Sequence, residues 1–221
     1  MSSPEMLQTT DRSKLRTRPQ RGHFERSVIN QILDEALVVH VGFVIDGQPF
    51  VIPMSYGRDG DRLYLHGATT SRMLKSLEQG LDVCVTATLL DGIVLARSLF
   101  HHSMNYRSVV LFGHATAVEA EAEKAHALEV LSEHIVPGRC EQARRPTAAE
   151  IKATSVLAFP IEEGSAKIRS GEPVDAAEDY ALPVWAGQLP LKLMAGDPIP
   201  DSKLPADIAI PENVTHYQRG S

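Results

Sequence analysis

Residues 63–77, LYLHGATTSRMLKSL, place a histidine, three hydroxyl groups and two cations at the join between an apolar strand and a helix. Ser71 and Lys75 are four residues apart and share one helix face, and Arg72 lies in the first turn. A helix N-terminus has unpaired N–H groups that bind phosphate readily, whereas cations there oppose the helix dipole unless an anion is bound. The pattern predicts an anion site; the alternative is an ordinary capped helix with two solvated cations.

Other motifs for phosphate or acyl chemistry do not occur in the sequence. It has no G-x-x-x-x-G-K-[ST] loop, and no G-x-G-x-x-G follows a strand. The G-x-S-x-G motif of α/β-hydrolases is also missing. Lys and Arg total 22 against 28 Asp and Glu, a net charge of −6, so we expect no nucleic-acid partner.

The join follows a run of hairpins. Asp46-Gly47 and Asp59-Gly60 separate β-branched and aromatic runs, a strong hairpin signal. A helix with Ser27 as its N-cap precedes them. The expected elements are a helix over 27–37 and antiparallel strands at about 38–45, 49–57 and 61–66.

The rest of the chain continues this pattern of strands and helices. Asp91-Gly92 is expected to join two strands, LDVCVTATLL and IVLARS, and VVLFGHATAVE forms another. A helix follows in AEAEKAHALEVLSEHIV, Thr147 caps a short helix, and SVLAFPIEEGSAKIRSG supplies two last strands. Six to eight strands in sequential hairpins predict an antiparallel sheet that curls or closes, a β-barrel decorated with helices.

Composition divides the chain into three parts. Residues 1–22 are polar and basic and predict an irregular N-terminal arm, and residues 23–171 form the barrel domain. Seven of the fourteen prolines fall in residues 172–221, so we expect an extended C-terminal segment that packs on the barrel or on a partner subunit.

Cysteine usage and hydropathy favour the cytoplasm. Cys84 and Cys140 are far apart without CxxC spacing, so no disulfide framework is expected. The N-terminus has no apolar signal region, and no run reaches the roughly 18 to 20 apolar residues of a bilayer span. We therefore expect a cytoplasmic protein with no membrane partner.

Three blocks together resemble the flavoproteins related to pyridoxamine 5′-phosphate oxidase: VGFVIDGQPFVIPMSYG, LYLHGATTSRMLKSL and FHHSMNYRSVVLFGHA. The resemblance covers roughly residues 20–170, extends to PVWAG in the tail, and is closest to the nitroimidazole-resistance-type branch. It implies an FMN-binding split β-barrel of the α+β class, mainly β, with peripheral helices. It also implies a homodimer with the flavin at the subunit interface, so that both chains complete each site.

The resemblance assigns a cofactor-binding role to residues in each block. FVIPMSY is similar to the strand along the isoalloxazine ring, and the strand–helix join is similar to the cradle of the ribityl phosphate. The residues implied are Ile52, Pro53, Met54 and Ser55 at the ring, His66, Ser71, Arg72 and Lys75 at the phosphate or ribityl chain, and Asn105, Arg107 and Ser108 at the polar edge or phosphate. His66 also matches a histidine discussed as an active-site group, and is the one candidate for a catalytic role; the alternative is a residue that only packs on the flavin.

The sequence departs from true pyridoxamine-phosphate oxidases near its C-terminus. It has no R-x-H pair after SAKIRSGEP, so vitamin B6 oxidation is not expected. Lys167 and Arg169 are the nearest cations, either outward residues of an edge strand or groups near the partner's flavin. Trp185 either anchors the tail on the barrel or covers the flavin.

The expected function is an FMN-dependent oxidoreductase that transfers hydride to or from a small molecule, with NAD(P)H or the deazaflavin F420 as electron donor. One alternative is a non-catalytic flavin-binding module for storage or sensing. Another is a haem-binding split barrel, with His101 or His102 as the iron ligand. No other metal site is expected, since His126 and His134 are eight residues apart without a carboxylate at ligand spacing.

Overall fold

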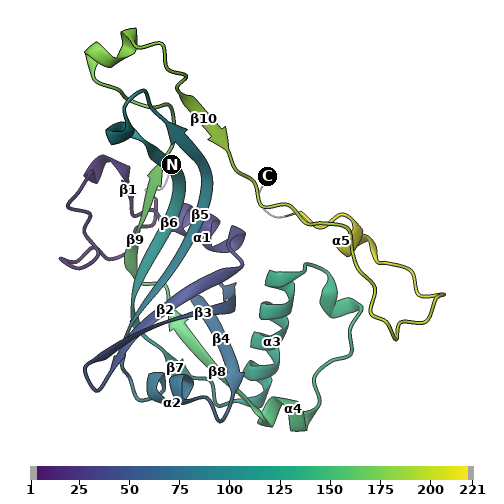
Figure 1. Cartoon of the computed structure of the whole chain (residues 1–221). Coiled ribbons are helices and arrows are strands. Elements are labelled where there is room, and N and C mark those ends of the chain that lie inside the picture. Colours follow the sequence, from purple (N-terminus) through teal and green to yellow (C-terminus); the bar gives the residue numbers. More distant parts are fainter. Residues whose placement is uncertain (1–3, 219–221) are drawn as a thin grey trace.

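The computed structural model describes residues 4–218 of the 221-residue chain (Figure 1). Its strands are β1 (Gly22–His23), β2 (Val38–Ile45), β3 (Gln48–Asp59), β4 (Arg62–Ala68), β5 (Asp82–Leu95), β6 (Ser103–His114), β7 (Thr116–Ala117), β8 (Thr154–Pro160), β9 (Glu163–Arg169) and β10 (Gly187–Pro190). Its α-helices are α1 (Arg26–Glu35), α2 (Arg72–Leu77), α3 (Glu121–Ile135), α4 (Ala148–Lys152) and α5 (Glu212–Thr215). Among these residues, no helix is both long enough and apolar enough to cross a membrane.

Strands β2, β3 and β4 form the two predicted antiparallel hairpins. Asp46 and Gly47 have positive φ angles of 51° and 76°, as a tight turn between twisted strands requires. β3 and β4 each end two residues later than the predicted 57 and 66. The Asp-Gly signals therefore located both turns.

The hairpin predicted at Asp91-Gly92 is wrong. β5 runs without a break from Asp82 to Leu95, and its register against β6 shifts between Leu90 and Gly92. Asp91 is the extra residue of a β-bulge, because β6 pairs with β5 on both sides of it. A bulge and a turn have similar local composition, and only the long partner strand distinguishes them.

The strands form one antiparallel sheet in the order β1-β9-β6-β5-β2-β3-β4-β8-β7, with β10 added to β5. Within residues 4–218, seven strands have seven or more residues, which agrees with the expected six to eight. The two ends of this order do not pair, so the sheet is curled but not closed. The predicted split β-barrel is confirmed.

The core lies between helix α1 and the inward faces of the strands. Ile29, Ile32 and Leu33 of α1 are fully or almost fully buried and pack against alternating strand residues such as Val39 and Val41. This alternation is what places one face of each strand in the core. The helix ends at Glu35, two residues before the predicted 37.

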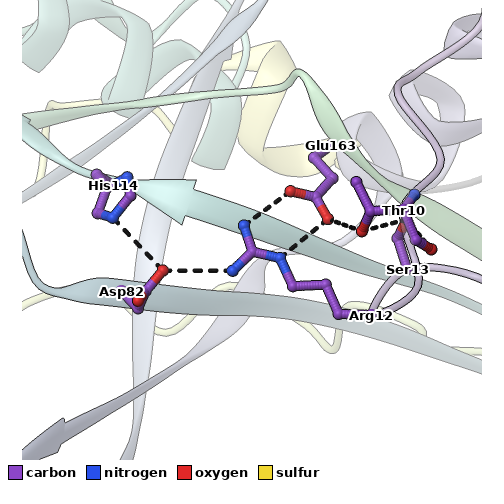
Figure 2. Close-up of polar contacts among 6 residues, drawn as sticks. All are labelled: Thr10, Arg12, Ser13, Asp82, His114 and Glu163. Atoms are coloured by element: carbon purple, nitrogen blue, oxygen red, sulfur yellow. Dashed lines mark hydrogen bonds and ion pairs between the residues drawn. The ribbon is translucent and has the colours of Figure 1, made fainter.

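The N-terminal segment packs on the barrel through polar contacts (Figure 2). Arg12 Nη2 lies 2.7 Å from Glu163 Oε2 of β9, and Arg12 Nη1 lies 3.3 Å from Asp82 Oδ1 of β5. His114 of β6 contacts the same Asp82 oxygen at 3.4 Å. Leu7 is buried in the core cluster. Residues 4–18 are therefore mostly irregular but attached to the barrel, and a short 3₁₀ helix at Pro19–Arg21 leads into β1.

The C-terminal segment extends away from the barrel and returns at α5 (Figure 1). β10 pairs with residues 92–95 of β5, and Asn213 of α5 donates to the carbonyl of Pro137 just after α3. Trp185 is 68 % exposed, with its ring against Gly187. The ring therefore contacts β10 of its own sheet but is largely uncovered, and its role as an anchor or as a cover of the flavin remains a prediction.

Candidate functional site

The sheet forks between β3 and β4. Pairing between them extends only from Asp59↔Arg62 to Tyr56↔Leu65. Beyond that point, residues 48–55 of β3 pair only with β2, while β4 continues on β8 through Ala68. Within the described residues 4–218, one backbone edge of β3 is thus left without a strand partner for eight residues. Such an edge offers hydrogen bonds to a ligand.

The expected ring-binding residues line this free edge. Ile52 and Met54 are half-buried and pack against the core, whereas Pro53 between them is exposed. Ser55 is half-buried beside the end of the fork at Tyr56. The structure therefore brings all four residues to one arm of the fork.

The other arm carries the expected phosphate residues. α2 has only six residues, and its N-cap Ser71 accepts a hydrogen bond from the Leu74 N–H at 3.4 Å. The apolar face of α2 is buried against β4. Leu74 packs so closely on Gly67 of β4 that a Cβ atom at position 67 would lie 2.9 Å from Leu74 Cδ1. This packing leaves Arg72 and Lys75 exposed. The two side chains, more than the short helix itself, supply positive charge here.

One contact joins the two arms. The Arg72 guanidinium lies 5.4 Å from the centre of the Phe50 ring of β3, a cation–π geometry. In the described part of the chain, neither Arg72 nor Lys75 pairs with a carboxylate. Both cations therefore remain available to an anion bound in the fork.

His66 lies at the branch point, directly after Leu65, the last β4 residue paired with β3. Its Nδ1 is buried without a hydrogen-bond partner among the residues described. Burial lowers the pKa of the imidazole below 6.5, so that the neutral form prevails at pH 7. A buried nitrogen without a hydrogen-bond partner costs free energy, and the His66 side chain also lines a cavity.

The cavity has a volume of about 290 Å³ and lies between His66, α3 and the segment 139–146. Gly57 fixes the position of α3, since a Cβ there would lie 2.8 Å from the Leu131 backbone nitrogen. The cavity was not predicted from the sequence. The sequence pattern that could have indicated this cavity is the apolar spacing of α3, followed by the basic run GRCEQARR. Apolar and cationic side chains line it, among them Leu128, Leu131, Ile135, Arg139, Arg144 and Arg145.

The third expected group lies on β6, separated from β3 by β5 and β2. Asn105 is buried and donates to Gln188 Oε1 at 2.7 Å, and Ser108 donates to the Lys167 carbonyl at 3.3 Å. The structure does not bring these residues into the fork of the same chain. Their role at a flavin remains a prediction.

Arg107 of β6 is already neutralised. It forms ion pairs with Glu35 of α1 and with Asp91 of the bulge, at 2.8 Å to Asp91. Both carboxylates raise the pKa of Arg107 above its usual value. Sequence analysis missed both partners, which are 72 and 16 residues away along the chain.

Arg169 is not an outward residue of an edge strand. Its side chain is buried and donates to the carbonyls of Gly171 and Glu172, and to Asn105. Burial lowers the pKa of this guanidinium. Arg169 thus fastens the start of the C-terminal segment to the sheet, while Lys167 remains half-buried beside it.

The residues of the fork fit a flavin. A flat ring needs an apolar wall with backbone donors and acceptors, and a phosphate needs cations. The unpaired β3 edge supplies the first, and Arg72 and Lys75 supply the second. The partnerless nitrogen of His66 at the branch point adds a polar group without a role inside the apoprotein.

Comparisons with known proteins point to one family. Residues 25–168 match the family model described as pyridoxamine 5′-phosphate oxidase. A flavocytochrome from Azotobacter vinelandii is similar, at 38 % identity over 96 % of this chain and 98 % of that one, with a TM-score of 0.89. An FAD and haem binding protein from Mycobacterium smegmatis is 37 % identical over 88 % of this chain and 95 % of that one, with a TM-score of 0.84.

A more distant structure belongs to a putative 5-nitroimidazole antibiotic resistance protein from Bacteroides thetaiotaomicron. It is 25 % identical over 66 % of this chain and 86 % of that one, with a TM-score of 0.57. Among curated proteins, no sequence matches this chain significantly.

Proposed function

The chain belongs to the pyridoxamine 5′-phosphate oxidase family, and from this membership we propose that it is a flavin-dependent oxidoreductase whose flavin lies in the fork between β3 and β4. The observation that carries the proposal is the eight-residue unpaired edge of β3 facing two cations without carboxylate partners. The similar proteins from Azotobacter and Mycobacterium support it, because one is named a flavocytochrome and the other an FAD and haem binding protein.

Each arm of the fork has its own task in this proposal. The β3 edge with Ile52, Pro53 and Met54 orients the ring, while Arg72 and Lys75 hold the phosphate by charge-assisted hydrogen bonds. A bound flavin supplies two-electron hydride chemistry, and no side chain of the fork is required as an acid or base for that step. Neutral His66 at the branch point excludes water and offers a nitrogen to substrate or cofactor.

We propose FMN as the cofactor, because the two positive charges of Arg72 and Lys75 match the charge of one terminal phosphate group. FAD is the alternative, supported by the name of the Mycobacterium protein. NAD(P)H or F420 is the proposed electron donor. The two free cysteines are in keeping with a reducing, cytoplasmic setting.

The proposed enzyme is a homodimer that completes each flavin site at the subunit interface. Leu99 and Phe100, at the end of the barrel, are each 88 % exposed. The tail adds further exposed apolar side chains, among them Leu193, Met194 and Ile199. Large exposed apolar side chains that gather in patches are typical of protein–protein interfaces. We take a second copy of this chain as the partner.

Haem binding is a second candidate function, favoured by the names of the same two similar proteins. In this candidate the chain holds haem in addition to flavin. Haem uptake by flavin-loaded protein, followed by absorption spectroscopy, tests it.

The experiment on the flavin function is anaerobic reduction of the purified protein. Denaturation and chromatography first identify the released cofactor as FMN or FAD. NADH, NADPH or reduced F420 is then added to intact protein, and bleaching of the flavin absorption is followed. We expect one donor to reduce bound flavin much faster than free flavin. Reduction no faster than in free solution, with every donor, would leave the non-catalytic module as the function.

A further inference from the structure

We propose that the cavity between His66 and α3 is a haem pocket, with the His66 imidazole as an iron ligand and Arg139 at the haem carboxylates. This inference rests on the proposed function, in that it assigns the place of the second cofactor beside the flavin fork. The walls of the cavity, its histidine nitrogen and its rim charges each support it.

The walls suit an apolar planar ligand. Leu128, Leu131 and Ile135 of α3 follow one another at helical spacing of three and four residues, so they present one apolar face to the cavity. The volume of about 290 Å³ lies just below the usual range of ligand cavities, roughly 300 to 1,000 Å³, so a ligand as large as haem would keep one edge outside the cavity. The exposed segment 139–145 forms its outer rim, where a polar edge of a ligand can reach water.

The nitrogen suits iron. Imidazole is the commonest metal ligand among side chains, and His66 is the histidine that lines the cavity. Because Nδ1 has almost no accessible surface, a ligand in the cavity must approach His66 through Nε2. Neither ring nitrogen is occupied by a hydrogen bond within residues 4–218, unlike His126 and His134, whose Nε2 atoms bond to Asp59 and to the Ala36 carbonyl.

The rim charges suit the two carboxylates of haem. Arg144 is paired with Glu150 at 2.8 Å and Arg145 with Glu129, so both are partly neutralised. Within residues 4–218, the guanidinium of Arg139 contacts the amide oxygen of Gln142 at 3.3 Å and forms no ion pair with a carboxylate. It is therefore the rim cation best able to bind an anionic group.

The histidines expected from the sequence, His101 and His102, lie in a different environment. A ring nitrogen of His101 and carboxylate oxygens of Asp175 and Asp179 lie within 4.8 Å of one another. His102 Nδ1 is already bonded to the Ser98 carbonyl at 2.9 Å. Asp175 is paired with Arg97 at 3.1 Å, but Asp179 has no ion pair within residues 4–218 and repels haem carboxylates, whereas Arg139 at the rim beside His66 attracts them. The electrostatics separates the two candidates.

The test is titration of flavin-loaded protein with ferric haem, followed by absorption and electron paramagnetic resonance. We expect saturable binding with the spectrum of a histidine-bound haem. His66→Ala should lose that signature, and added imidazole should restore it, because imidazole can enter the space left by the side chain. The matched control His101→Ala, which also removes a buried, unpartnered Nδ1, should keep the wild-type spectrum.

The variant Arg139→Ala keeps the proposed iron ligand His66 and tests the proposed contact with the haem carboxylates. It should weaken haem binding about tenfold with the histidine spectrum retained. His66→Ala with an unchanged spectrum, or loss of the signature in His101→Ala alone, would overturn the assignment. Protein that holds flavin but takes up no haem would refute this inference and leave the flavin proposal standing. Protein that takes up haem but binds no flavin would refute the flavin proposal and leave the haem pocket standing.

Discussion

Arg72 and Lys75 decide, at the scale of single residues, whether the fork can hold a cofactor. Both are exposed on α2, and one of them reaches across to Phe50 on the opposite arm. Neither is needed for packing, since the buried face of α2 is made by Met73, Leu74 and Leu77. Their proposed role can therefore be tested without harm to the fold.

The double variant Arg72→Ala, Lys75→Ala should lose flavin and keep its structure. Each charge-assisted hydrogen bond to phosphate contributes about 1.5 to 3 kcal/mol, so the pair should cost a factor of about 100 or more in affinity. Fluorescence titration measures the affinity, and circular dichroism checks the fold. Retention of stoichiometric flavin by the double variant would mean that the phosphate lies elsewhere.

The sequence allowed prediction of residues whose neighbours are local and failed where partners are distant. Ser71, Arg72 and Lys75 lie on one short helix, and their grouping follows from helical spacing. Arg107 could not be interpreted in the same way, because Glu35 and Asp91 meet it only in the folded sheet. The orphaned nitrogen of His66 depends equally on tertiary packing.

Elements set the geometry of the fork and of the cavity beside it. The Asp-Gly hairpins were predictable from local sequence, but the point where β3 leaves β4 was not. That point depends on β4 continuing along β8, about ninety residues later in the chain. The close approach of α3 to β3 at Gly57 could not be predicted either, because Gly57 and Leu131 are distant in the sequence.

Gly57→Ala should push α3 away from the sheet. The new Cβ would lie 2.8 to 2.9 Å from backbone atoms of Leu131 and Val130. Rotation of a side chain cannot relieve this clash, because the atoms involved belong to the backbone. We expect a loss of about 1 to 3 kcal/mol in the free energy of unfolding, measured by urea denaturation. Gly196→Ala is the control, because a Cβ at this position would have no neighbouring atom within 4 Å, and it should be neutral.

The N-terminal segment should detach from the barrel at acidic pH. The hydrogen bonds from Arg12 hold the pKa of Glu163 below 4.5. Because the folded-state pKa is lowered, the stabilisation is present above pH 4.5 and is lost as the pH falls through the lowered value. Hydrogen exchange of residues 5–14 should therefore accelerate at low pH.

Glu163→Gln should show the same acceleration already at neutral pH, since it removes the carboxylate that Arg12 and Thr10 bind. Glu162→Gln is the matched control, because Glu162 is next to Glu163 in the sequence and its side chain is exposed. Equal protection of the segment in both variants at pH 7 would show that Leu7, and not the ion pair, holds it in place.

The whole molecule presents a barrel and a long apolar tail that its own barrel does not cover. Leu193, Met194 and Ile199 are 77 %, 78 % and 93 % exposed. The proline-rich composition predicted an extended segment, but not the side on which its apolar residues would lie. That side depends on what the tail packs against, which in our proposal is a second copy of the chain.

Replacement of Leu193, Met194 and Ile199 by serine should weaken the dimer. Analytical ultracentrifugation over a range of concentrations should show a higher dissociation constant, because apolar burial drives association. The control replaces the charged residues Asp197, Asp201 and Lys203, which are exposed on the same segment, by serine and should leave the dimer intact. An unchanged dimer in both variants would exclude this part of the tail from the interface.

Flavin binding by the purified wild-type protein tests the account most directly. Titration with FMN and with FAD, followed by flavin fluorescence and visible absorption, should show saturable binding of about one flavin per chain. A correctly folded protein that stays colourless and binds neither flavin at micromolar concentration would contradict the assignment of the fork.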